Sequence, residues 1–196
     1  MIIRTSNILA TLLIIIAIHK LPAQHAEGSL VDERDGRTYR TVQFSIPTAV
    51  EGVVLTREWM AENLMYESDQ SYCYKNHDSY CDAYGRLYNF NSAVGACPTG
   101  WRLPTHKDWM ELVDVHGGLQ AAGNRMGEGG GSPLELLYSG FGKSGGYYHG
   151  VEQEGYYWGL QASASAGVFV LQRGNGQVFH DNADVKYLTP IRCIKE

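Results

Sequence analysis

The chain has 196 residues, a formal net charge of −5, four cysteines, 23 glycines, 13 tyrosines and four tryptophans. It carries no dense run of lysine and arginine, and nucleic-acid binding depends on such clustered cations. Composition and charge therefore argue against a nucleic-acid partner. The many glycines and aromatic residues favour short strands, frequent turns and ring packing.

Residues 1–24 have the three regions of a cleaved secretory signal. Arg4 supplies a positive charge, an apolar run covers residues 8–18, and small residues around Ala23 and Ala26 offer cleavage positions. The run is shorter than the roughly 20 residues that a transmembrane helix needs. We therefore expect export, with no transmembrane segment after signal cleavage. An uncleaved membrane anchor is the alternative.

The rest of the chain is long enough for one domain with a proper core. Residues 25–35 are polar and charged, which predicts a flexible lead-in to a domain over residues 36–196. Residues 38–44 alternate as a strand does, and residues 53–56 predict a second strand that runs into a loop. A short polar loop is expected over residues 74–80.

The strongest helix signal begins at Thr105. Thr105 and Asp108 predict a capping box, and apolar side chains follow at helical spacing from Trp109 onwards. Gly117 and Gly118 predict its end. Residues 91–95 and 119–126 are weaker helix candidates.

The part after residue 136 looks wholly β. The glycine-rich segment 127–132 lacks the Gly-Lys-Ser/Thr ending of a phosphate loop, so we expect a plain loop there. The sequence Gly174-Asn175-Gly176 predicts a hairpin turn, because these residues accept positive φ at little cost. The expected strands are residues 137–141, 147–150, 156–159, 168–173, 177–180 and 191–194.

Several motifs in a fixed order carry a family resemblance. They are WMAENL (residues 59–64), YGRLY (84–88), CPTGWRLPT (97–105), GYYW (155–158) and IRCI (191–194). In this order they resemble the Fibrobacter succinogenes major paralogous domain (FISUMP) family over residues 35–196. The resemblance implies an extracellular bacterial domain with a C-type lectin-like fold, mostly without an assigned biochemical function. The fold class expected is thus α+β, with short antiparallel strands, one or two short helices and disulfide bridges.

Four cysteines allow three pairings, and sequence alone does not choose between them. The resemblance implies Cys97 with Cys193 and Cys73 with Cys81. It also implies a mature protein that is secreted or displayed on the outer surface of a bacterium, with the periplasm as another location. The segment after Trp158 reads Gly-Leu-Gln-Ala-Ser, where the family commonly has Ser-Ser-Thr.

Catalysis and metal binding are not expected. Formylglycine-generating enzymes share the implied fold but depend on reactive cysteines, and Lys75 and His77 are the only basic neighbours of Cys73 and Cys81 in sequence. We expect no catalytic residue, no metal site and no cofactor. The five histidines after residue 25 share no pair spacing typical of zinc: His77, His106, His116, His149 and His180. Residues 181–184 offer oxygen ligands for calcium, but a turn is the simpler interpretation.

Recognition by a surface is the function that these observations favour. Tyrosine-rich, glycine-supported loops make adaptable contacts at low cost in conformational entropy. The predicted contact residues are Tyr147, Tyr148, His149, Tyr156, Tyr157, Gln161, Gln172, Arg173, Asn175 and Gln177. Trp101, Trp109 and Trp158 are predicted core residues.

Two functional classes stay open. One is a binding module for an extracellular protein or glycan, and the other is a structural subunit of a cell-envelope or adhesin-type assembly. An enzyme on a formylglycine-generating-enzyme-like scaffold is a minor third alternative.

Overall fold

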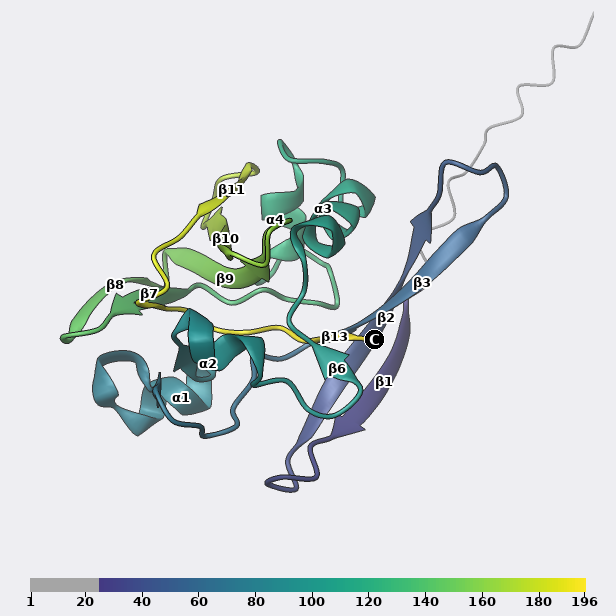
Figure 1. The fold of residues 1–196 in the computed structure, drawn as a ribbon. Helices are drawn as coiled ribbons and strands as arrows, with labels where there is room; N and C mark the ends of the chain where they lie inside the picture. The colour runs from purple at the N-terminus through teal and green to yellow at the C-terminus, as the bar shows by residue number, and fades with distance from the viewer. Residues whose placement is uncertain (1–24) are drawn as a thin grey trace, which may run out of the picture.

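The computed structural model describes residues 25–196 (Figure 1). The expected signal peptide, residues 1–24, lies outside the described residues. Within residues 25–196, no helix combines the length and apolar character needed to span a membrane.

The first sheet is antiparallel, with strand order β1-β2-β3-β13-β6. Its strands are β1 (Ala26–Val31), β2 (Thr38–Pro47), β3 (Val54–Met60), β6 (Trp101–Arg102) and β13 (Ile194–Lys195). The strand predicted over residues 38–44 is confirmed as part of β2, which extends to Pro47 and buries Val42, Phe44 and Ile46 on one face. Figure 1 shows the β2–β3 hairpin projecting from the rest of the molecule.

The second sheet has the order β11-β10-β9-β7-β12, with β8 paired to β7. Its strands are β7 (Ser139–Lys143), β8 (Tyr147–Val151), β9 (Glu154–Leu160), β10 (Ala166–Gln172), β11 (Val178–Asn182) and β12 (Tyr187–Leu188). All pairings are antiparallel except β7 with β9, which meet in parallel at Gly140 and Gly155. The predicted hairpin at residues 174–176 joins β10 to β11, and Gly174 has a φ of +77°.

Four α-helices and one 3-10 segment lie in the part of the chain between β3 and β7. They are the 3-10 segment η1 (Tyr74–Asn76) and the helices α1 (Asp78–Tyr84), α2 (Phe90–Val94), α3 (His106–Val115) and α4 (Ala122–Met126). A two-stranded ladder of β4 (Ser71–Tyr72) and β5 (Leu87–Tyr88) flanks η1 and α1. The predicted capping box is confirmed: Thr105 accepts from the amide of Asp108, and the Asp108 carboxylate accepts from the amide of Thr105.

The core lies where α3 packs between the sheets. Trp109 is fully buried, 4.9 Å from Trp59 and 5.3 Å from Phe169 between ring centroids. Its indole N–H donates to the backbone oxygen of Trp158, 3.1 Å away. Trp101, Trp109 and Trp158 are all buried, as predicted.

Both implied disulfides are present. Cys73 is bonded to Cys81 and Cys97 to Cys193, and all four cysteines are thereby paired. The first bridge closes the short segment that contains η1 and the start of α1. The second joins the chain before β6 to the residue before β13.

The fold differs from the sequence-based expectations in three places. The lead-in contains β1, which pairs with β2 along its whole length, because β2 has a free edge there. The polar segment between Cys73 and Cys81 folds into η1 and the start of α1, since its bridge closes over only eight residues. Helices are consequently more numerous than the one or two expected, and the last strand is shorter, with β13 beginning only at Ile194.

Candidate functional site

Five ring-bearing side chains gather on one surface of the second sheet. We call them the aromatic face: Phe141, Tyr147, His149, Tyr156 and Tyr187. Phe141 lies at the centre, with its ring centroid 4.6 Å from that of Tyr156 and 5.4 Å from that of Tyr187. The rings of Tyr147 and His149 are nearly parallel, at an interplanar angle of 11°. Tyr147 is 51% exposed, so its ring is open to a partner.

Strand pairing explains why these rings meet. Phe141 of β7 is directly opposite His149 of β8, and Lys143 is opposite both Tyr147 of β8 and Tyr187 of β12. Residues opposite one another in an antiparallel pair project to the same face. Four short strands therefore concentrate rings that are up to 46 positions apart in the sequence.

The ammonium group of Lys143 lies over the aromatic face. The ammonium nitrogen of Lys143 is 4.9 Å from the ring centroid of Tyr187, 5.6 Å from that of Tyr147 and 5.9 Å from that of Phe141. Ring quadrupoles attract a cation at such distances. The surface thus presents apolar rings together with a positive hydrogen-bond donor.

Glu154 supplies the acidic group at the border of the aromatic face. Its carboxylate accepts from the hydroxyl of Tyr156 at 3.0 Å and from the side-chain amide of Gln172 at 3.2 Å. The Nε2 atom of His149 is 3.7 Å from the same carboxylate. Burial and the hydrogen bond to Glu154 raise the pKa of Tyr156, so its hydroxyl stays a neutral donor.

The structure divides the predicted tyrosine pairs between two faces. Tyr147 and Tyr156 belong to the aromatic face, whereas Tyr148 and Tyr157 project to the opposite side. Tyr148 packs on Tyr74 and donates to the side chain of Asn76. Tyr157 is fully buried and its hydroxyl donates to the backbone oxygen of Leu137. It lies on the buried face because successive side chains of a strand point to opposite faces.

The polar members of the predicted contact set are dispersed. Gln172 reaches the aromatic face through Glu154, but Arg173 is bound to the backbone oxygen of Glu152 and the carboxylate of Glu128. Asn175 and Gln177 belong to the β10–β11 turn, where the Asn175 side chain accepts from the amide of Gln177. Gln161 lies at the other end of β9, against Gly167.

Four contributors were missed by reasoning from the sequence: Phe141, Lys143, Glu154 and Tyr187. Phe141 and Lys143 are two positions apart on one strand of a hairpin, as Tyr147 and His149 are on the other. The alternation of side chains along the two strands could therefore have placed Phe141 and Lys143 on the same face as Tyr147 and His149. Tyr187 had no such signal, because β12 has only two residues and pairs with β7 from a distance in sequence.

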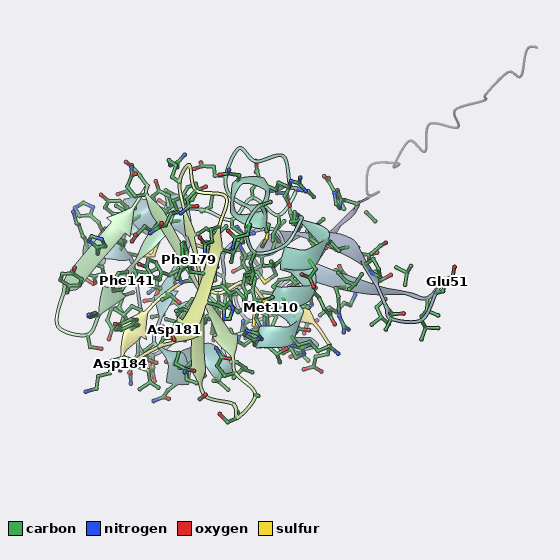
Figure 2. The ribbon with its side chains drawn as sticks, turned by 90° about the horizontal axis from the view of Figure 1, so that it is seen from above. Glu51, Met110, Phe141, Phe179, Asp181 and Asp184 are labelled. Carbon is green, nitrogen blue, oxygen red and sulfur yellow. A yellow bond between two sulfur atoms is a disulfide. The ribbon has the colours of Figure 1, made fainter. Side chains whose placement is uncertain are left out.

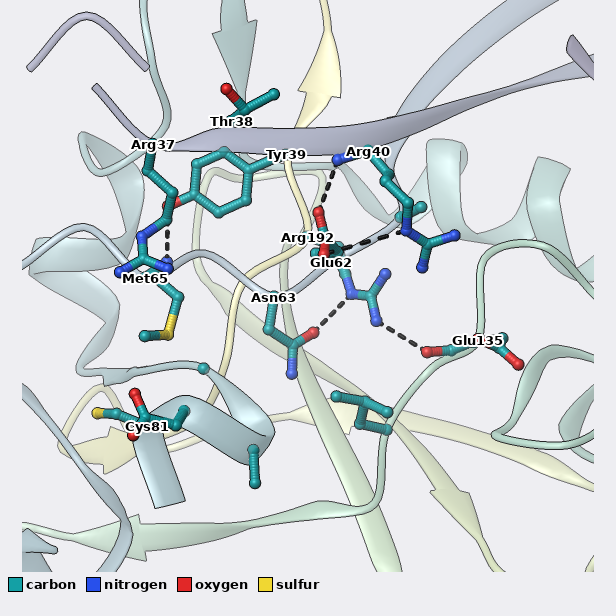
Figure 3. A pocket seen from close by; sticks show the side chains of 15 residues that line it. Arg37, Thr38, Tyr39, Arg40, Glu62, Asn63, Met65, Cys81, Glu135 and Arg192 are labelled. Carbon is teal, nitrogen blue, oxygen red and sulfur yellow. Dashed lines mark hydrogen bonds and ion pairs between the residues drawn. The ribbon is translucent and has the colours of Figure 1, made fainter. Parts of the chain in front are cut away.

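A second feature is a cavity of about 310 Å³ beside the fully buried Arg192 (Figure 3). The Arg192 guanidinium donates to the Asn63 side chain and to the backbone oxygens of Met60, Leu134 and Glu135. These acceptors are neutral, and burial lowers the pKa of Arg192. Arg192 therefore ties three separate segments together just before Cys193.

Comparison with known protein families places this chain. A family model described as the Fibrobacter succinogenes major domain matches residues 54–195. The chain belongs to this family. No curated protein and no solved structure matches it.

The Fibrobacter succinogenes major domain of this protein runs from the first residue of β3 into β13. It contains the aromatic face, Arg192 and both disulfides, whereas β1 and β2 precede it. Within residues 25–196, no group of three or more His, Cys, Asp or Glu side chains is arranged to hold a metal ion.

Proposed function

We propose that the protein is an exported, noncatalytic binding module with a C-type lectin-like fold, whose aromatic face contacts an extracellular protein or glycan on the outer surface of a bacterium. The observation that carries this proposal is the open cluster of rings around Phe141, with Lys143 above it. Tyrosine rings offer large contact areas and lose little conformational entropy on binding.

The composition of the aromatic face suits recognition. Aromatic side chains are enriched at protein interfaces, where a few of them supply most of the binding free energy. The faces of the Tyr147 and His149 rings also offer flat apolar surfaces to the C–H groups of a sugar. Glu154, Gln172 and Lys143 supply acceptors and donors beside these rings for polar groups of either ligand.

The test combines a glycan array with capture of surface proteins from neighbouring cells, followed by affinity measurement for each hit. We expect the double variant Tyr147→Ala, His149→Ala to weaken binding at least tenfold, while Tyr72→Ala leaves it unchanged. Tyr72 is a matched control because it is 40% exposed and lies outside the aromatic face. Equal affinities for the double variant and the unaltered chain would refute the proposed contact surface.

A structural subunit of a cell-envelope or adhesin-type assembly is the second candidate, and the β2–β3 hairpin favours it. The tip of this hairpin exposes four apolar side chains: Val50, Val53, Val54 and Leu55. Figure 2 labels Glu51 at this tip, far from Phe141 on the second sheet. Exposed apolar patches often mark contacts with other molecules.

Sedimentation at several concentrations separates the two candidates. An assembling subunit forms oligomers that the variant Val54→Asp, Leu55→Asp abolishes, whereas a binding module stays monomeric with or without that change. The minor enzymatic alternative needs reactive thiols, and all four cysteines are engaged in disulfides.

A further inference from the structure

Two histidines that are 74 positions apart in the sequence meet at the surface between α3 and β11. The Nε2 atom of His106 lies 3.4 Å from the Nδ1 atom of His180. Figure 2 shows the neighbourhood: β11 is labelled at Phe179 and Asp181, and α3 is labelled at Met110. We propose that His106 and His180 together bind a divalent transition-metal ion of the nickel, copper and zinc group.

The separation of the two nitrogen atoms fits a shared metal. Imidazole nitrogens bind Zn²⁺ at about 2.0–2.1 Å, and two ligands of a tetrahedral ion are then about 3.3–3.4 Å apart. The observed 3.4 Å is longer than the usual separation of about 2.9–3.0 Å for a direct hydrogen bond between nitrogen and oxygen atoms. The two nitrogen atoms already lie at the separation that a shared ion requires, and the ion would replace the long hydrogen bond between them.

Packing holds both rings in place before any ion arrives. The ring centroid of the buried Phe169 is 5.5 Å from that of His106 and 5.6 Å from that of His180. Phe169 is directly opposite His180 in the β10–β11 pairing. His106 is the first residue of α3, directly after the Thr105 capping box. Because both backbones are held by regular structure, the ion does not have to order the ligands itself.

The ligand chemistry of the pair also suits a metal. A neutral imidazole ring offers one nitrogen lone pair to a metal ion, and each of the two histidines can supply one. Imidazole nitrogens suit nickel, copper and zinc, whereas magnesium and calcium prefer oxygen ligands. His180 is exposed and His106 is half-buried, so an ion reaches both nitrogens and keeps positions for water or a donor atom of a partner.

This site could not be predicted from the sequence, because zinc-site motifs are recognised by short spacings between their ligands. A separation of 74 residues follows no local pattern, and only the packing of α3 on the second sheet joins the two rings. The inference is independent of the aromatic face, in which neither histidine takes part.

The test is calorimetric titration of the chain, purified without a histidine tag, with NiCl₂ and ZnCl₂, and with MgCl₂ as the control salt. We expect one saturable site for nickel and zinc and none for magnesium. His106→Gln and His180→Gln should each weaken binding at least tenfold, whereas His77→Gln should leave it unchanged. His77 is the matched control because it is exposed and its side chain caps neither η1 nor α1.

A second measurement needs no variant. Bound Ni²⁺ is paramagnetic, so it should broaden the ring resonances of Phe169 in the unaltered chain before those of Tyr72. The proposal is overturned if nickel does not saturate a site, if His77→Gln weakens binding as much as His180→Gln, or if broadening spares Phe169.

Discussion

Two regions of the molecule differ in whether their side chains are engaged within the fold or exposed to solvent. The first region, which we call the β13 junction, comprises Asn63, Cys97, Arg192 and Cys193, and the second is the aromatic face. Each of these four side chains is engaged: Arg192 with Asn63 and three backbone oxygens, and Cys97 with Cys193. On the aromatic face the rings contact each other at one side and solvent at the other.

The difference separates residues that stabilise the fold from residues that we propose bind a partner. Groups buried with satisfied hydrogen bonds are costly to disturb, because removing one partner leaves the others unpaired. Exposed rings contribute little to folding, since their surface stays in water. Substitutions at the β13 junction should therefore change the free energy of unfolding, and substitutions on the aromatic face should change binding alone.

The largest expected effect is loss of the Cys97–Cys193 bridge. It closes a loop of 96 residues, and on the chain-entropy estimate such a bridge contributes about 4–5 kcal/mol. The Cys73–Cys81 bridge closes eight residues and contributes about 2–3 kcal/mol. Denaturant unfolding of the variants Cys97→Ala, Cys193→Ala and Cys73→Ala, Cys81→Ala should show this ranking, and the reverse order would contradict it.

Arg192→Met should have the next largest effect. The substitution leaves the Asn63 oxygen and the backbone oxygens of Met60, Leu134 and Glu135 without their donor, at a cost of at least about 3 kcal/mol. Arg173→Met is the matched control, because the side chains of Arg173 and its partner Glu128 are 44% and 46% exposed and surface ion pairs contribute at most about 1 kcal/mol. Similar losses for the two variants would mean that burial of Arg192 does not stabilise the junction.

A smaller, pH-dependent effect is expected at His116. Its ring is buried, with Nδ1 2.8 Å from the Leu112 backbone oxygen and Nε2 2.9 Å from the Ser132 hydroxyl. Burial lowers the pKa of His116, so the unfolded chain binds a proton at a higher pH than the folded chain. The free energy of unfolding should therefore fall as the pH drops below about 6.5, the ordinary pKa of histidine.

His116→Gln isolates this contribution. Unfolding curves measured at pH 7.5 and at pH 5.5 should differ less for His116→Gln than for the unaltered chain. His77→Gln, at an exposed position, should keep the full difference. An unchanged pH dependence in His116→Gln would assign the effect to other groups.

The smallest expected change in stability belongs to the aromatic face. Tyr147→Ala removes an exposed ring, so the free energy of unfolding should stay within about 0.5 kcal/mol of the unaltered value. Tyr157→Ala lies nearby in sequence but removes a buried ring, and it should cost about 3–5 kcal/mol, by analogy with other buried aromatic truncations. Thermal unfolding of the two variants measures the contrast, and equal melting temperatures would contradict the assignment of faces.

Much of the fold followed from local patterns in the sequence. The α3 capping box, the alternation in β2 and the turn at residues 174–176 depend on near neighbours, and all three were predicted. The burial of the tryptophans was also predicted, from their apolar character, although their contacts are with residues distant in the sequence. The family motifs also implied the pairing of Cys97 with Cys193. Strand β1 and helix α1 were not predicted, because one depends on the edge of β2 and the other on the closure of a disulfide.

The candidate site was predicted in part. Tyr147, His149 and Tyr156 were identified and do meet, but Tyr148 and Tyr157 were grouped with them although the alternation of β8 and β9 directs those two rings to the other side. No local spacing in the sequence predicted that Tyr187 joins the aromatic face or that His106 lies beside His180.

By itself, the sequence determined the helix signals, the turn residues and the alternation of apolar side chains, since each of these depends on residues a few positions apart. Only the tertiary structure decided which rings share a surface and which histidines lie 3.4 Å apart. Those contacts join strands and helices that are distant along the chain, and they form only when burial of the common core brings the two sheets and α3 together.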